Sequence, residues 1–148
     1  MNIAGWNMKY FNLAIIEATK SQMEHKIGCV AVYKKKVIAS GYNYDGFVQI
    51  IGSKLRAHAE MCTIVKLLRR SAHKISINKV DIYIARVTPA GISISKPCKA
   101  CTSVIHKLFI KNIYYTTEEI FIKEKGIALN TEHKSKCYRM IEAGLYKQ

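Results

Sequence analysis

The apolar residues of this chain alternate between helical and strand periodicity, and this alternation limits the fold more than any other feature. Residues 7–22 have helical spacing, and they are followed by β-rich runs at 27–33 and 37–42 around the lysines at 34–36. Two such runs joined by a short polar turn are typical of an antiparallel hairpin. The apolar stripe expected for the first helix is Phe11, Ala14, Ile15 and Ala18.

The rest of the chain continues the alternation. In order, we expect a polar loop at 43–57, a helix at 58–71 buried through Met61, Ile64, Val65 and Leu68, a strand at 79–87, a loop through Pro89 and Gly91, a helix at 98–109, strands at 112–117 and 120–125, and a helix at 133–143 that Gly144 ends. Only Glu118 and Glu119 separate the last two strands, which leaves no room for a crossover helix and predicts an antiparallel pair.

The order αββαβαββα predicts a three-layer α/β/α sandwich, in which helices cover both faces of a mixed five-stranded sheet. A length of 148 residues favours one domain, 1–148. The stretch MNIAGWNMKYF has polar breaks where a signal peptide needs an apolar run, and no window reaches the roughly 18 to 20 apolar residues of a membrane span. We therefore expect a cytoplasmic protein.

The formal net charge of +14 has two interpretations. Clustered cations bind nucleic acid through its phosphates, so the charge raises the probability of a polyanionic partner. The excess is mostly lysine, however, and it is scattered among abundant Ile, Asn and Tyr, as A- and T-rich coding would also produce. The charge alone does not decide between them.

The cysteines point to metal binding or catalysis. Five cysteines at uneven spacing do not suit a secreted disulfide framework, and we expect Cys29 and Cys137 to be core residues. Cys98 and Cys101 are three residues apart directly after Pro97, so both sulfurs can face one point in the first turn of a helix. The positive end of a helix favours thiolates, which are metal ligands.

Two cysteines do not complete a zinc site, and a third donor is available at the start of another expected helix. His58 lies there, and an imidazole with two thiolates forms a three-ligand set that leaves one position of Zn²⁺ open for water. Glu60 follows two residues later and can flank the same cavity. An alternative is a closed structural zinc with Cys62 as fourth ligand, in a non-catalytic binding module.

The segments His58-Ala59-Glu60 and Pro97-Cys98-Lys99-Ala100-Cys101 together resemble the signature of the zinc-dependent cytidine and deoxycytidylate deaminase superfamily. Each opens an expected helix after a β-region. Gly41-Tyr42-Asn43 ends a hairpin strand, where this superfamily places a substrate-binding asparagine. The resemblance spans about Lys9 to Thr117 and implies a cytidine deaminase-like fold.

The resemblance also implies the chemistry. One Zn²⁺ per chain would be held by His58, Cys98 and Cys101, and it would activate a water that attacks C4 of cytosine. Glu60 would carry the proton from water to ring N3 and help ammonia leave. Asn43 and the backbone N–H of Ala59 would hold the sugar or base.

The expected function is therefore zinc-dependent hydrolytic deamination of a cytosine nucleoside or nucleotide (cytidine, deoxycytidine or dCMP). Relatives form dimers or tetramers, which implies a homo-oligomer. The alternative is an editing deaminase acting on tRNA or single-stranded DNA, suggested by the charge and by Tyr42, Tyr44 and Phe47 as stacking residues. The antiparallel last strand resembles the free-nucleoside enzymes, whereas His58 resembles the ligand of the deoxycytidylate and tRNA adenosine deaminases. Lys54, Arg56 and Arg86 are candidates for binding a substrate phosphate.

Overall fold

The structure of the protein is a computed structural model that describes residues 8–130, apart from the side chains of 71–74. The expected helix at 133–143, with Gly144 and Cys137, lies outside the described residues. The elements are α1 (Met8–Ala18), β1 (Lys26–Tyr33), β2 (Lys36–Tyr42), β3 (Phe47–Ile50), β4 (Ser53–Arg56), α2 (Ala59–Lys74), η2 (Ile77–Lys79), β5 (Asp81–Thr88), β6 (Gly91–Ser93), α3 (Lys99–Leu108), β7 (Asn112–Thr116), β8 (Phe121–Lys125) and η3 (Gly126–Ala128).

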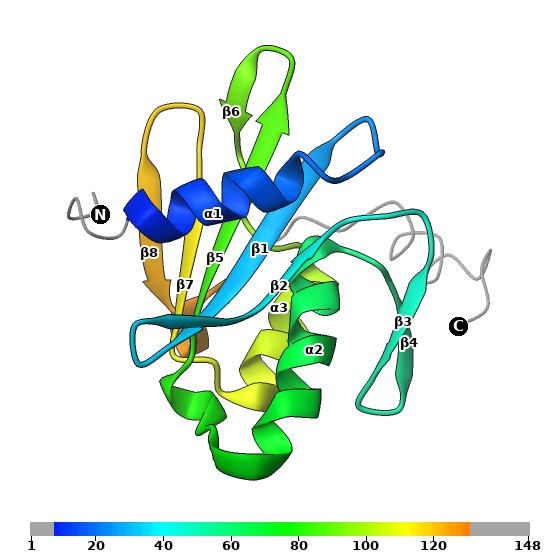
Figure 1. The fold of residues 1–148 in the computed structure, drawn as a ribbon, viewed down its shortest axis with the longest axis vertical. Helices are drawn as coiled ribbons and strands as arrows, with labels where there is room; N and C mark the ends of the chain where they lie inside the picture. The colour runs from blue at the N-terminus through cyan, green and yellow to red at the C-terminus, as the bar shows by residue number, and fades with distance from the viewer. Residues whose placement is uncertain (1–7, 131–148) are drawn as a thin grey trace.

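The central sheet has the strand order β2-β1-β5-β7-β8 (Figure 1). Strands β5 and β7 are parallel because α3 crosses over between them, and the other neighbours on this path are antiparallel. The mixed five-stranded sheet is thus confirmed, and short β6 adds a sixth strand beside β5. Within the described residues, no helix is both long and apolar enough to cross a membrane.

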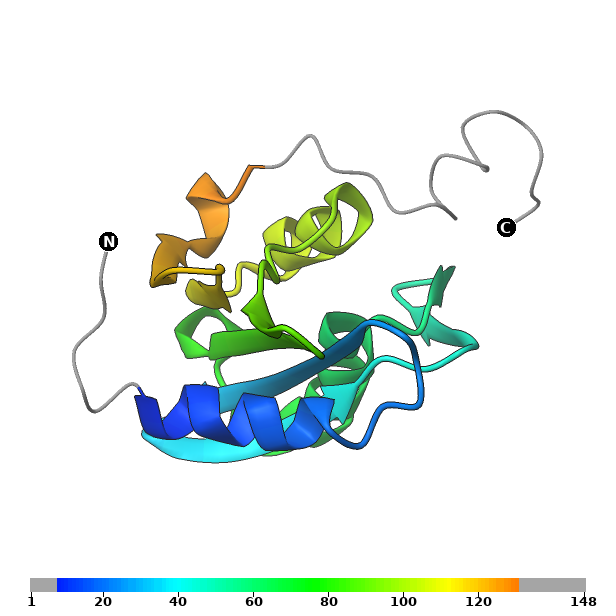
Figure 2. The same cartoon turned by 90° about the horizontal axis from the view of Figure 1, so that it is seen from above.

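Helices cover both faces of the sheet, as Figure 2 shows from above. Ile82 and Ile84 of β5 belong to the core cluster beneath α2 and α3, whereas Tyr83 and Ala85 belong to the cluster beneath α1. This alternation follows from the period of two along a strand. The three-layer α/β/α arrangement predicted from the sequence is therefore present.

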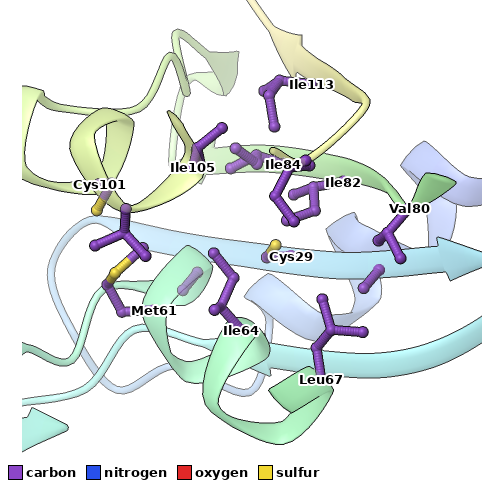
Figure 3. Packing of buried hydrophobic residues seen from close by; sticks show 14 of the residues in the cluster. Cys29, Met61, Ile64, Leu67, Val80, Ile82, Ile84, Cys101, Ile105 and Ile113 are labelled. Carbon is purple, nitrogen blue, oxygen red and sulfur yellow. The ribbon is translucent and has the colours of Figure 1, made fainter. Parts of the chain in front are cut away.

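The larger core cluster leads from the sheet to the starts of α2 and α3. In Figure 3, Met61, Ile64 and Leu67 of α2 lie over β1, with Ile82 and Ile84 of β5 beyond it, and Cys101 of α3 lies at the edge of the cluster. The buried stripe of α2 differs from the expected one, since Leu67 is fully buried while Val65 and Leu68 are only half-buried.

The antiparallel β7–β8 pair is confirmed, although two glutamates are poor residues for a tight hairpin turn. The turn is held by Thr117 instead. Its hydroxyl accepts hydrogen bonds from the backbone N–H of Ile120 at 2.9 Å and of Glu119 at 3.3 Å. A side chain can replace a missing turn residue in this way.

The prediction of an irregular loop at 43–57 is wrong, because this segment contains the hairpin β3–β4, which lies beside α2 (Figure 1). Its turn places Ile51 at φ 50° and Gly52 at φ 75°. A β-branched residue with positive φ is rare, so the sequence carried no turn signal at Ile51. The loop expected through Pro89 and Gly91 is likewise shortened by β6.

Gly28 fixes the distance between α1 and the sheet and gives a stability test. A Cβ atom there would lie 2.1 Å from the carbonyl oxygen of Ala14 and 2.3 Å from the nitrogen of Ala18, both backbone atoms. Gly28→Ala should lower the free energy of unfolding by about 3 kcal/mol, the upper end for overpacking, as measured by urea unfolding. The control is Gly52→Asn, which faces open space and keeps a residue that tolerates positive φ. Equal midpoints for both variants would contradict this packing.

Candidate metal centre

His58 and Cys98 occupy equivalent positions at the starts of two helices. Each is the N-cap residue with extended backbone, His58 for α2 and Cys98 for α3. The first helical hydrogen bonds run from Cys62 N–H to the His58 carbonyl and from Thr102 N–H to the Cys98 carbonyl. Neither N-cap side chain caps a backbone N–H of its own helix, so both are available for other contacts.

The three predicted donors lie together. His58 Nδ1 is 3.4 Å from Cys101 Sγ and 3.7 Å from Cys98 Sγ, and the three donor atoms all lie within 4.8 Å of one another. A tetrahedral zinc with ordinary bonds of about 2.0 Å to nitrogen and 2.3 Å to sulfur needs N···S separations of about 3.5 Å. The donor set therefore fits one Zn²⁺ bound through Nδ1, and among the described residues it supplies three of the four positions.

The charges of the group also suit a metal. Hydrogen bonding from Cys101, reinforced by His58, lowers the pKa of Cys98 to about 4, while the pKa of Cys101 is raised well above its usual range by sharing that proton and by burial. Burial by itself lowers the pKa of His58, but its contact with Cys98 and the charge of Glu60 raise it overall. One thiolate is thus already present, and zinc would displace the remaining protons.

Glu60 is placed beside this group in the first turn of α2. Its side chain is only 4% exposed, and burial raises its pKa, against the opposing influence of His58. Its carboxyl is close enough to Cys101 to interact with that thiol. A buried carboxyl group with a raised pKa can both accept and return a proton, which is the property of a general base and acid.

Cys62 does not join the metal group. The described residues within metal-binding distance of one another are His58, Cys98 and Cys101 alone. Cys62 instead faces a hollow beneath the β3–β4 hairpin, and burial raises its pKa to about 11, so it is a neutral thiol. A closed zinc site with Cys62 as fourth ligand is therefore not what the structure shows. Cys29 is fully buried in the core, as expected.

Two hydrogen bonds hold the side chain of Asn43. Its Oδ1 accepts a hydrogen bond from Ile27 N–H at 2.9 Å, and its Nδ2 donates to the His25 carbonyl at 2.7 Å. The next residue, Tyr44, donates its N–H to Ala57, which precedes the metal-binding histidine. An asparagine amide retains a second hydrogen and a second lone pair after these contacts.

A pair of hydroxyl groups that the sequence did not reveal holds the segment leading to Cys98. Ser95 Oγ donates to the Ile84 carbonyl at 2.8 Å and accepts from the Thr116 N–H at 2.8 Å. The two hydroxyl oxygens are 2.9 Å apart, and both residues are buried. This Ser95–Thr116 clasp ties the loop before α3 to β5 and β7. No local pattern distinguishes these two small polar residues.

The comparisons with known proteins agree with this geometry. The family model described as the cytidine and deoxycytidylate deaminase zinc-binding region matches residues 4–117. The chain belongs to this deaminase family. The comparison with curated proteins found no significant match.

Solved structures of deaminases share the fold. A dCMP deaminase from the cyanophage S-TIM5 is 21% identical, with 79% of this chain and 87% of that chain covered and a TM-score of 0.55. A cytidine deaminase from Burkholderia pseudomallei is 17% identical, with 89% and 100% covered and a TM-score of 0.61. A structure from a study of A-to-I editing by tRNA:A34 deaminases is 20% identical, with 74% and 75% covered and a TM-score of 0.50. Such identities show the fold and leave the substrate open.

Metal content tests the ligand set of this deaminase. The purified protein should hold one zinc per chain, and Cys101→Ser should lose most of it because a hydroxyl is a poor ligand for this site. Cys62→Ser is the matched control and should retain zinc, since Cys62 lies outside the group. Elemental analysis of both variants measures this, and zinc loss in Cys62→Ser alone would contradict the site.

The Ser95–Thr116 clasp gives a second test. Ser95→Ala leaves the Ile84 carbonyl and the Thr116 N–H without their buried partner, which should cost about 1–3 kcal/mol of stability. Because the clasp holds the loop before Cys98, zinc should also dissociate faster, as followed with a chromogenic chelator. Thr88→Val, which removes an exposed hydroxyl contact in the β5–β6 turn, serves as control. Unchanged zinc release in Ser95→Ala would show that the clasp does not position the ligands.

Proposed function

We propose that the protein is a zinc-dependent hydrolytic deaminase that converts the cytosine of a nucleoside or nucleotide, such as cytidine, deoxycytidine or dCMP, to uracil and releases ammonia. The observation that carries the proposal is the group of three donors at zinc spacing with the buried carboxyl of Glu60 beside it. Membership of the deaminase family supports it, and the cyanophage deaminase of similar fold has a structure with dCMP and dUMP.

In this proposal His58, Cys98 and Cys101 are the metal ligands, and bound zinc supplies a position at which water ionises near neutral pH. Glu60 accepts one proton from the attacking water and delivers it to ring N3 of cytosine. As oxygen bonds to C4 and the C4–N bond breaks, Glu60 passes the second water proton to the amino group, which leaves as ammonia. The burial of Glu60 suits this exchange because it raises the pKa of the carboxyl and so favours the protonated form through which the exchange passes.

Asn43 and Ala59 are the proposed substrate contacts. The spare amide hydrogen and lone pair of Asn43 can bond to a sugar hydroxyl, and the side chain is already held rigidly by the His25 carbonyl and the Ile27 N–H. The backbone N–H of Ala59 is in the first turn of α2, where helix donors lack partners within the helix. It can therefore donate to the base.

A second candidate function is editing of a base within tRNA or single-stranded DNA. A hollow of about 470 Å³ beneath the β3–β4 hairpin combines aromatic and basic side chains, with Tyr42, Tyr44, Phe47, Lys66 and Arg69 among its lining residues. Aromatic rings and cations together are the features that bind unpaired nucleotides. The net charge of +14 and the fold shared with the tRNA:A34 deaminase structure also support this candidate.

Three broader expectations belong to the same proposal. The chain is taken as a single deaminase domain, 1–148, acting as a homo-oligomer in the cytoplasm. The four cysteines in the described part of the chain are free, which suits a reducing compartment. Light scattering measures the oligomeric state directly.

Glu60→Gln tests the mechanism. The variant should keep one zinc per chain and lose at least about 10²- to 10⁴-fold in turnover, since an amide cannot transfer protons. The control is Glu17→Gln, which changes another buried glutamate in α1. Ammonia release is measured on cytidine, deoxycytidine, dCMP, a cytosine-containing oligonucleotide and tRNA. Retained turnover in Glu60→Gln would overturn the mechanism, and turnover of the polynucleotides alone would favour the second candidate.

A further inference from the structure

Two basic side chains meet at the end of the sheet, and neither has an acidic partner among the described residues. Arg86 Nη2 lies 2.9 Å from His25 Nδ1. Salt bridges between described residues join Lys20 to Glu17, Arg56 to Asp45 and Lys96 to Glu124, and none involves Arg86. The Nε atom of Arg86 is also buried, and it has no hydrogen-bond partner within the part of the chain that the structure describes. Leaving a half-buried cation unmatched is costly, so this group requires an explanation.

The strand register directs Arg86 toward the layer that holds the metal centre. Arg86 comes two residues after Ile84 in β5, so it lies on the same face of the sheet, which α2 and α3 cover. Its register partner in β1 is Ile27, which packs against the same core cluster. The loop that leads to Cys98 is attached to Ile84 through Ser95. Arg86 therefore lies two residues beyond Ile84, toward the carboxyl end of β5, on the face of the sheet that also holds the metal ligands.

A chain of contacts connects this pair with the metal centre. The His25 carbonyl accepts the hydrogen bond from Asn43 Nδ2, and Tyr44, next to Asn43, is bonded to the residue before His58. Along this chain of contacts the order is His58, then Asn43, then His25 with Arg86. A nucleotide has the same order of parts, namely the reacting base, the sugar and the phosphate.

The two other basic candidates for a phosphate contact are already engaged. Arg56 is 3.2 Å from Asp45, and its guanidinium carbon lies 5.2 Å from the centre of the Phe47 ring. The ammonium of Lys54 lies 4.8 Å from the same ring. Arg86 is the candidate that has neither a carboxylate nor a phenyl or phenol ring among its described contacts.

We propose that Arg86 and His25 bind the phosphate of the substrate, so that this deaminase acts on a cytosine nucleoside 5′-monophosphate in preference to the free nucleoside. An arginine donates paired N–H groups in a geometry that matches phosphate oxygens, and the imidazole adds a second donor when it turns from Arg86 to the anion. This inference rests on the proposed function, because it assigns the outer end of the same substrate site.

Kinetics with matched substrates test the assignment. Wild-type protein should deaminate dCMP with a higher kcat/KM than deoxycytidine, and Arg86→Gln should reduce kcat/KM for dCMP by about 10- to 100-fold, the range for a hydrogen bond to a charged group. Turnover of deoxycytidine should not change. Arg56→Gln, which removes an arginine that is paired with Asp45, should affect neither substrate. Equal kcat/KM for dCMP and deoxycytidine in wild type, or an equal loss on both in Arg86→Gln, would overturn the inference.

Binding measurements separate this inference from the proposed function. Calorimetry with dUMP and deoxyuridine should show tighter binding of dUMP to wild type and a loss of that difference in Arg86→Gln, whether or not turnover occurs. Binding of dUMP without any deamination would defeat the proposed function and support the phosphate site. Deamination of deoxycytidine with no preference for binding dUMP over deoxyuridine would support the proposed function and defeat the phosphate site.

Two further binding experiments, with inorganic phosphate and with a trinucleotide, complete the test. Thermal unfolding shows whether Arg86→Gln folds. If it does not, the test is whether inorganic phosphate competes with dUMP for binding to the wild-type protein. Absence of competition would overturn the phosphate site. A trinucleotide with a central cytosine distinguishes a phosphate monoester from a polynucleotide backbone. Tighter binding of the trinucleotide than of dUMP would contradict the assignment to a mononucleotide.

Discussion

The meeting of two helix N-termini at one point is the constraint on which this structure depends. The positive ends of α2 and α3 face a common site through the N-cap residues His58 and Cys98, and two such ends repel each other. Negative charge between them removes the repulsion. The Cys98 thiolate, with a pKa of about 4, supplies it. The chain therefore holds a favourable position for a thiolate-bound cation as a direct consequence of how its helices are arranged.

The sheet determines where these helix starts lie. Parallel pairing of β5 with β7 requires a crossover, and α3 is that crossover, so Cys98 must lie beyond the carboxyl end of β5. The Ser95–Thr116 clasp then fixes the loop before α3 between the two strands. Asn43, which follows β2, is hydrogen bonded to the start of β1, and this bond brings the proposed substrate contact to the same edge. The site thus depends on backbone register more than on contacts between its own side chains.

Local patterns in the sequence predicted the parts of this structure that depend on local physics. The hairpin of β1 and β2, the helices after His58 and Cys98, and the ligand set itself follow from periodicity and from the spacing of donor residues. The β3–β4 hairpin was missed because Ile51 adopts a positive φ that no propensity indicates. The contact of Arg86 with His25 joins residues 61 positions apart, so no window of sequence contains it.

The charge of the chain becomes informative only after its cations are placed. Most of the lysines that make up the excess of +14 lie at exposed positions such as Lys35 and Lys125, where salt screens their effect within about 8 Å. Total charge therefore does not distinguish a polynucleotide from a small anion as the partner. Arg86 differs because it is half-buried, has no acidic partner among the described residues, and contacts His25, whose carbonyl accepts a hydrogen bond from Asn43. A cation held in that environment attracts an anion at one defined position, and it is screened much less than the surface lysines.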